Sequence, residues 1–190
     1  DIALMRTIPG MTIINPADET ESKKAVFAAM ELDGPVYIRF GRLAVPVIFD
    51  DDYNFEVGKG VELREGSDVT IIATGLMVNE ALQAYELLKA EGISARIINM
   101  ATIKPLDNEI VLKAARETGA VVTAEEHSVI GGLGGAVCEL LSGECPVPVV
   151  RLGVYDTFGH SGPAADLLDE FGLRAANIVE KAKLAVSMKK

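Results

Sequence analysis

Apolar runs alternate with amphipathic stretches over most of the chain. From Asp68 onward, short runs rich in Val, Ile and Ala are followed by segments with the 3.6-residue period of helices that bury one face. The predicted strands read VTIIATG, SARIINM, AVVTAEE and PVVRLGV, and the helices between them read MVNEALQAYELLKAEG, LDNEIVLKAARETG and LGGAVCELLSGE. Such alternation is typical of a parallel sheet covered on both faces. We therefore predict an α/β domain over residues 66–190, with three α/β/α layers and a parallel or mostly parallel sheet.

A smaller unit precedes this domain. MTII, residues 11–14, reads as a short strand, a helix follows, and GPVYIRF, residues 34–40, returns as a second strand. Asp18 is a natural N-cap for the helix, and Glu21 stands three residues later, as in a capping box. Two strands and one helix cannot bury both faces of a sheet, so residues 1–48 are expected to be part of a larger α/β domain.

The periodic pattern stops between these two units. The intervening segment contains several glycines and the acidic cluster Asp50–Asp52, without a helical or strand-like period. We predict a linker over residues 49–65.

Composition and charge exclude several classes of function. Hydrophobic residues make up 49% of the 190 residues, but aromatic residues only 5%, so the core should be aliphatic. The formal net charge of −10 repels phosphodiester backbones and anionic membranes. We therefore expect no nucleic-acid partner and no membrane partner. Cys138 and Cys145 lack the spacing of a zinc site or a disulfide framework. Reduced thiols and a cytoplasmic location are expected.

Candidate acid–base chemistry follows the strand AVVTAEE. Glu125, Glu126 and His127 come at its carboxyl end, the edge at which open α/β sheets usually build sites. They could act as general acids or bases or bind a divalent ion. However, neighbouring residues on an extended segment point in opposite directions, which favours an interface or loop-anchoring role. A small-anion site at the strand ends near Gly75, Glu125 and Asp156 is a further alternative.

Two other motifs have a structural and a functional interpretation. The glycines of GGLGGAV, residues 131–137, do not follow a strand directly as a dinucleotide fingerprint requires, so a tight turn that lets the next helix pack closely is favoured. His160 and Ser161 could form part of a nucleophilic pair, but no G-x-S-x-G elbow surrounds the serine. A turn ahead of a helix is the favoured interpretation.

Two arginines end the strand in YIRFGR. Arg39 and Arg42 lie three residues apart, and guanidinium groups bind phosphate or carboxylate through paired hydrogen bonds. An ion pair with a nearby Asp or Glu is the competing interpretation. The chemistry of these residues leaves both open.

Longer motifs resemble the transketolase superfamily of thiamine diphosphate enzymes. The run from DIALMR to YIRFGR resembles the second half of its pyrimidine-binding domain, and VTIIATGLMVNEAL, INMATIKPLD, VVTAEEHSVIGGLGGAV and DTFGHSGPAADLLDEFGL resemble its C-terminal domain. The closest likeness is the C-terminal half of a transketolase, especially the kind split into two polypeptides. The 1-deoxyxylulose-5-phosphate synthases and the β subunits of 2-oxoacid dehydrogenases are competing relatives.

The resemblance implies a function for the complete enzyme. It implies transfer of a two-carbon ketol unit between sugar phosphates, with thiamine diphosphate and Mg²⁺, in the pentose phosphate pathway. Arg42 matches the family arginine that holds the substrate phosphate. No catalytic residue, cofactor contact or metal ligand carries over to this chain, because the matching positions lie upstream or on a separate domain or subunit.

The resemblance also implies partners. An N-terminal half or subunit, a sugar-phosphate substrate and a homodimer are expected, and the chain alone is expected to be inactive. A hypothesis of another class makes residues 66–190 a non-catalytic dimerisation or interaction module.

Overall fold

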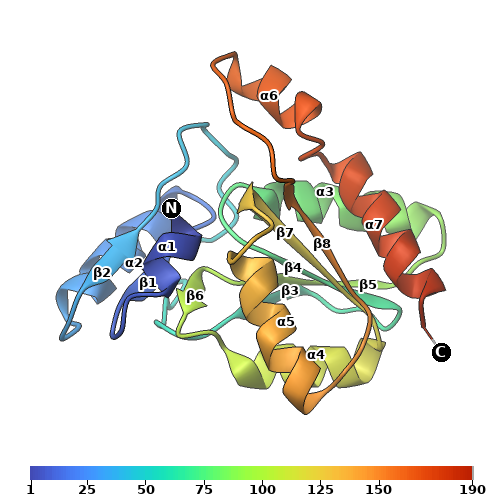
Figure 1. Ribbon diagram of the computed structural model, residues 1–190, viewed down its shortest axis with the longest axis horizontal. Helices are drawn as coiled ribbons and strands as arrows, with labels where there is room; N and C mark the ends of the chain where they lie inside the picture. The colour runs from blue at the N-terminus through green and yellow to red at the C-terminus, as the bar shows by residue number, and fades with distance from the viewer. Residues whose placement is uncertain (190) are drawn as a thin grey trace.

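The computed structural model describes residues 1–189, which form two sheets of unequal size (Figure 1). The larger sheet has the order β3-β5-β4-β7-β8, and four of its strands are parallel. Its edge strand β3 pairs antiparallel with β5. The strands are β3 (Val61–Arg64), β4 (Val69–Ala73), β5 (Ala95–Asn99), β7 (Val121–Ser128) and β8 (Val149–Val154). The predicted α/β class with a mostly parallel sheet is therefore confirmed.

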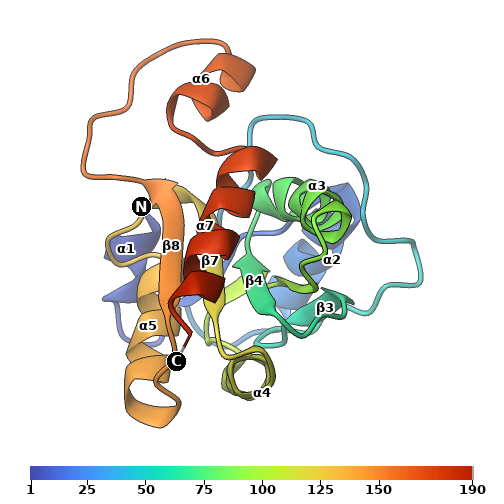
Figure 2. The ribbon, with the colours of Figure 1, turned by 90° about the vertical axis from the view of Figure 1, so that its right-hand side faces the viewer.

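Helices cover both faces of this sheet (Figures 1 and 2). Helices α3 (Met77–Ala90) and α7 (Ala175–Ser187) pack on one face, and α4 (Asn108–Thr118) and α5 (Leu133–Glu144) pack on the other. Successive side chains of a strand point to opposite faces of the sheet, so each strand contributes to both cores. Ile71 belongs to the core under α3 and α7, and its neighbour Ile72 belongs to the core on the opposite face. Helix α6 (Ala164–Glu170) follows an exposed loop and stands away from these layers in both views.

The smaller sheet joins the two units. Its order is β2-β1-β6, and β2 (Val36–Ile38) is parallel to β1 (Thr12–Ile14). Helix α2 (Glu19–Met30) connects these strands, and α1 (Ile2–Arg6) precedes them. The third strand, β6 (Thr102–Lys104), pairs antiparallel with β1. The sequence did not predict β6, which lies inside the segment assigned to the C-terminal domain.

The segment predicted to be a linker is packed against both units. It contains the unpredicted strand β3, and Phe49 is buried with its ring stacked on Tyr53 at a centroid distance of 3.9 Å. The Asp18 side chain accepts hydrogen bonds from the backbone N–H groups of Ile48 and Phe49. The domain boundaries at residues 48 and 66 stay a prediction, but the intervening chain is not a free connector.

The start of α2 differs from the predicted capping box. Asp18 is the N-cap, and its side chain accepts a hydrogen bond from Glu21 N at 2.7 Å. Glu21 is fully buried instead of reaching back to the cap, and its carboxylate accepts hydrogen bonds from Ala17 N, Tyr53 Oη and Asn99 Nδ2. Burial raises the pKa of Glu21 to about 7. This carboxyl therefore connects α2, the segment after β2 and strand β5.

No helix within residues 1–189 is long and apolar enough to cross a membrane. Cys138 and Cys145 are both free thiols.

Candidate functional site

A cavity of about 760 Å³ lies where the two units meet, at the carboxyl-terminal ends of the parallel strands. The loop after β2 contributes Arg42, strand β7 contributes Glu126, and the loop before α6 contributes His160 and Ser161. The rest of the lining is mainly apolar: Leu43, Ala44, Leu76, Val154, Gly162, Pro163, Ala164, Leu167, Leu168, Phe171 and Leu173. A concave, largely apolar site with a few charged groups is the usual form of a small-molecule site.

Arg42 presents an exposed guanidinium to this cavity. It takes part in none of the ion pairs formed within residues 1–189, although acidic residues outnumber basic ones in the chain. An arginine without a carboxylate partner retains its full capacity for paired hydrogen bonds to a ligand anion.

Arg39 forms ion pairs with acidic side chains, which is the other interpretation that the sequence left open. Its Nε lies 3.0 Å from Asp1 Oδ2, and its Nη1 lies 3.6 Å from Glu126 Oε2. The Tyr37 hydroxyl donates to the same Asp1 oxygen at 2.7 Å. Arg39 is therefore a structural ion-pair partner, whereas Arg42 is the arginine that lines the cavity.

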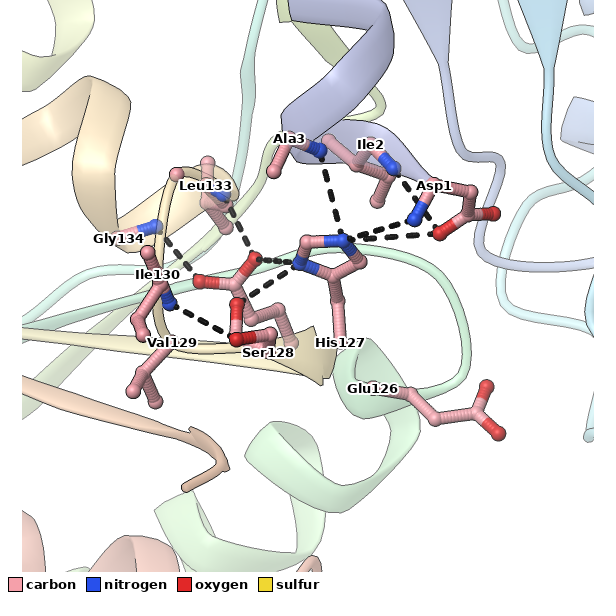
Figure 3. A network of polar contacts seen from close by, with 12 residues as sticks. Asp1, Ile2, Ala3, Glu126, His127, Ser128, Val129, Ile130, Leu133 and Gly134 are labelled. Atoms are coloured by element: carbon pink, nitrogen blue, oxygen red, sulfur yellow. Dashed lines mark hydrogen bonds and ion pairs between the residues drawn. The ribbon is translucent and has the colours of Figure 1, made fainter. Parts of the chain in front are cut away.

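Glu125 anchors the N-terminus of α5. The side chain is fully buried, and its two oxygens accept hydrogen bonds from Leu133 N at 2.7 Å and Gly134 N at 2.8 Å (Figure 3 shows both donors). These N–H groups would otherwise lack partners at a helix start that has no side-chain cap. Burial raises the pKa of Glu125 to about 7. The loop-anchoring interpretation is confirmed for this residue.

His127 shares the buried side of β7 with Glu125, whereas Glu126 points away from it (Figure 3). His127 Nδ1 lies 2.8 Å from Ser128 O, and Nε2 lies 3.5 Å from Ala3 N of α1. Burial lowers the pKa of His127, which favours a neutral ring. The residue therefore contacts the N-terminal unit and does not reach the cavity lined by Glu126, which agrees with the alternation expected along a strand.

The glycines before α5 are needed for close packing. A Cβ on Gly132 would lie 1.9 Å from Glu125 Oε2, and one on Gly134 would lie 2.7 Å from Thr123 Oγ1. Gly131 has a φ of +75°, which favours glycine. The structural interpretation of GGLGGAV is therefore confirmed by backbone geometry.

His160 and Ser161 lie in the exposed loop ahead of α6, as the turn interpretation predicts. His160 Nε2 is 2.7 Å from Glu170 Oε1, and this hydrogen bond raises the pKa of His160. Sequence reasoning did not connect His160 with Arg42, since the two are far apart in the chain and only the fold brings them to one cavity.

The site has the chemistry of anion binding. Among residues 1–189, no group of three or more His, Cys, Asp and Glu residues is placed to hold a metal ion. The two glutamates that are 0% exposed, Glu21 and Glu125, have their oxygens engaged by donors of this chain. The cavity can therefore bind and orient an anionic ligand through Arg42.

Comparison with known proteins identifies the class of protein. The family model described as "Transketolase, pyrimidine binding domain" matches residues 1–47, and the model described as "Transketolase, C-terminal domain" matches residues 58–178. The second match covers more than half of the chain, so the chain belongs to the transketolase family. The resemblance predicted from the sequence motifs is confirmed.

Particular relatives are named as a transketolase subunit and as a synthase. A 6-deoxy-6-sulfo-D-fructose transketolase subunit from Clostridium sp. (strain MSTE9) is 50% identical over 182 residues, which cover 96% of this chain and 56% of that protein. A 1-deoxy-D-xylulose-5-phosphate synthase from Heliobacterium modesticaldum is 42% identical over 186 residues, which cover 96% of this chain and 29% of that protein.

A solved structure gives a similar result. It is described as a split gene transketolase, inactive β4 tetramer, and it matches with a TM-score of 0.96 and 52% identity over 100% of this chain and 62% of that one. The chain thus spans less than two thirds of the length of each of these relatives.

Proposed function

We propose that this chain is the C-terminal part or subunit of a transketolase-type transferase, which moves a two-carbon ketol unit between sugar phosphates. The observation that carries the proposal is Arg42, an arginine without an ion pair in residues 1–189 that lines a cavity between the two units. In this proposal the guanidinium binds the substrate phosphate and contributes affinity and orientation. A cytoplasmic location and a place in the pentose phosphate pathway belong to the same proposal.

The family implies dependence on thiamine diphosphate. When bound, this cofactor supplies the carbanion chemistry for carbon–carbon bond cleavage and formation. The residues of this chain do not fit it, because Glu21 and Glu125 are occupied inside the fold and residues 1–189 hold no cluster for the metal of a diphosphate. We therefore place the cofactor and Mg²⁺ on the remainder of the enzyme, and we assign this chain no catalytic step.

The partners follow from the same reasoning. We propose that an N-terminal part or subunit completes the enzyme, and that residues 66–190 also provide a dimerisation and scaffold surface. The relative described as an inactive β4 tetramer supports self-association of this chain and its inactivity alone. The proposal predicts no turnover by this chain alone.

A 1-deoxy-D-xylulose-5-phosphate synthase is the second candidate, since one such enzyme is 42% identical over nearly the whole chain. The 50% identity to a transketolase subunit favours the first candidate. The products discriminate between them, because only the synthase forms 1-deoxy-D-xylulose 5-phosphate.

Replacing Arg42 in the complete enzyme tests the proposal. Arg42→Gln should lower kcat/KM for a phosphorylated acceptor by about 10- to 150-fold, because a hydrogen bond to a charged group contributes roughly 1.5 to 3 kcal/mol. With the unphosphorylated form of the acceptor, the change should be less than about two-fold. Steady-state kinetics with both acceptors measure the difference.

The matched control is Arg116→Gln. It removes one positive charge from the exposed surface of α4, outside the cavity. If Arg42→Gln lowers kcat/KM equally for the phosphorylated and unphosphorylated acceptors, or not at all, then the phosphate-binding role is wrong.

A further inference from the structure

The C-terminal unit contributes a second cationic group to the cavity that contains Arg42. His160 lies in the loop between β8 and α6, and it lines this cavity together with Ser161. Arg42 comes from the other unit, in the loop after β2. A ligand held by both residues would therefore contact both units of the chain, so the C-terminal unit would participate directly in substrate binding.

The imidazole ring is oriented by one strong contact. His160 Nε2 lies 2.7 Å from Glu170 Oε1 of α6, and the ring lies 5.7 Å from the Phe171 ring, centroid to centroid. The other nitrogen, Nδ1, makes only a 3.5 Å contact with Ser161 O, which is at the limit of a hydrogen bond. When the ring is protonated, the Nδ1–H group is therefore available to donate to a ligand.

The charges around the ring favour an imidazolium and leave a place for an anion. Glu170 faces His160 from α6, Arg42 faces the cavity from the loop after β2, and Glu126 faces it from β7. Glu126 also lies 3.6 Å from Arg39, which offsets its charge. The contact with Glu170 raises the pKa of His160 above its usual 6.5, so the ring is charged over more of the neutral range.

We propose that His160 is a second phosphate-binding residue of this enzyme, which together with Arg42 holds the phosphoryl group of the sugar-phosphate substrate. The inference rests on the proposed function, because it adds a residue to the site assigned to Arg42. It gives the C-terminal unit a role in substrate affinity and makes that affinity dependent on the protonation of one histidine. The fold thus assembles the phosphate site from both units.

Inhibition of the complete enzyme by sulfate is a suitable test. Sulfate keeps its two charges over the neutral range, whereas a phosphate monoester itself titrates near pH 6. In the wild type, the inhibition constant of sulfate against the phosphorylated substrate should rise about three- to ten-fold between about pH 6 and about pH 8, as His160 loses its proton. The same series with the unphosphorylated substrate shows whether sulfate competes at the phosphate position.

Substitutions at position 160 separate charge from structure. Sulfate should inhibit the His160→Gln variant only weakly at both pH values, because glutamine carries no positive charge at either pH. His160→Lys should keep strong inhibition at both, because a lysine stays protonated to about pH 10. Arg116→Gln, which lies outside the cavity, should match the wild type in kcat and in sulfate inhibition at both pH values.

The outcomes distinguish this inference from the function on which it rests. If Arg42→Gln weakens sulfate inhibition and His160→Gln behaves as the wild type at both pH values, only the role of His160 is overturned. The same holds if His160→Gln loses affinity that His160→Lys does not restore, which would indicate a structural role. If Arg42→Gln leaves sulfate inhibition unchanged, then the proposed phosphate site itself is wrong.

Discussion

The two units of this chain differ in how they obtain their buried surface. The five-stranded sheet has an aliphatic core on each face, built mainly from its own strands and from four covering helices, with Ile2, Ile13 and Ala17 of the smaller unit contributing to these cores. The three-stranded sheet takes its third strand, β6, from within the larger unit. Its helix α2 leaves Phe27 70% exposed and Met30 74% exposed. The smaller unit therefore depends for its stability on contacts with the larger one.

The largest expected effect comes from the core of the larger unit. Leu88 is fully buried among α3, α7 and the sheet. Leu88→Ala should lower the free energy of unfolding by about 2 to 5 kcal/mol, because it removes buried methyl groups and leaves a cavity. Urea unfolding of the purified chain measures this loss.

Met30→Ala in α2 is the comparison variant for the smaller unit. Its side chain is mostly exposed, so the substitution should change the free energy of unfolding by less than about 0.5 kcal/mol. If Leu88→Ala and Met30→Ala lower the free energy of unfolding by the same amount, then the proposed difference between the two units is wrong.

A smaller effect is expected where the two units meet. Burial raises the pKa of Glu21 from 4.5 to about 7, so the folded state binds a proton more tightly than the unfolded state. The stabilisation is present below about pH 4.5 and is lost as the pH rises through about 7, with a total near 3 kcal/mol. Glu125 has a similarly raised pKa and contributes to the same loss of stability as the pH rises. Stability should therefore decrease from about pH 5 to about pH 8.

Glu21→Gln should flatten this decline, because the amide does not titrate. Urea unfolding at a series of pH values measures it, and Glu19→Gln on the exposed side of the same helix is the matched control. A pH profile that is as steep in Glu21→Gln as in the Glu19 control would show that Glu21 is not the titrating group.

The difference between the two sheets also explains which strands could be predicted from the sequence. The four parallel strands of the larger sheet are apolar runs, and α5 occupies the predicted segment, residues 133–144. Strands β3 and β6 were missed, since they have only four and three residues and each depends on a partner strand elsewhere in the chain. Periodicity reports a buried face but not a long-range pairing.

The candidate site was predictable only in part. The spacing of Arg39 and Arg42 indicated a strand end with anion-binding groups, but only the fold shows that Arg39 is paired and Arg42 lines a cavity. The capping-box pattern predicted that the Glu21 side chain would reach back to the helix cap, whereas it is buried and accepts hydrogen bonds from Tyr53 and Asn99. The association of His160 with Arg42 has no signal in the local sequence, because it depends on how the two units pack.

A crystal structure of the complete enzyme with a bound sugar phosphate tests the central claim most directly. The account predicts that phosphoryl oxygens lie within about 2.7 to 3.2 Å of the Arg42 guanidinium, in the cavity between the two units. A phosphoryl group bound elsewhere, with Arg42 paired to an acidic side chain, would contradict it.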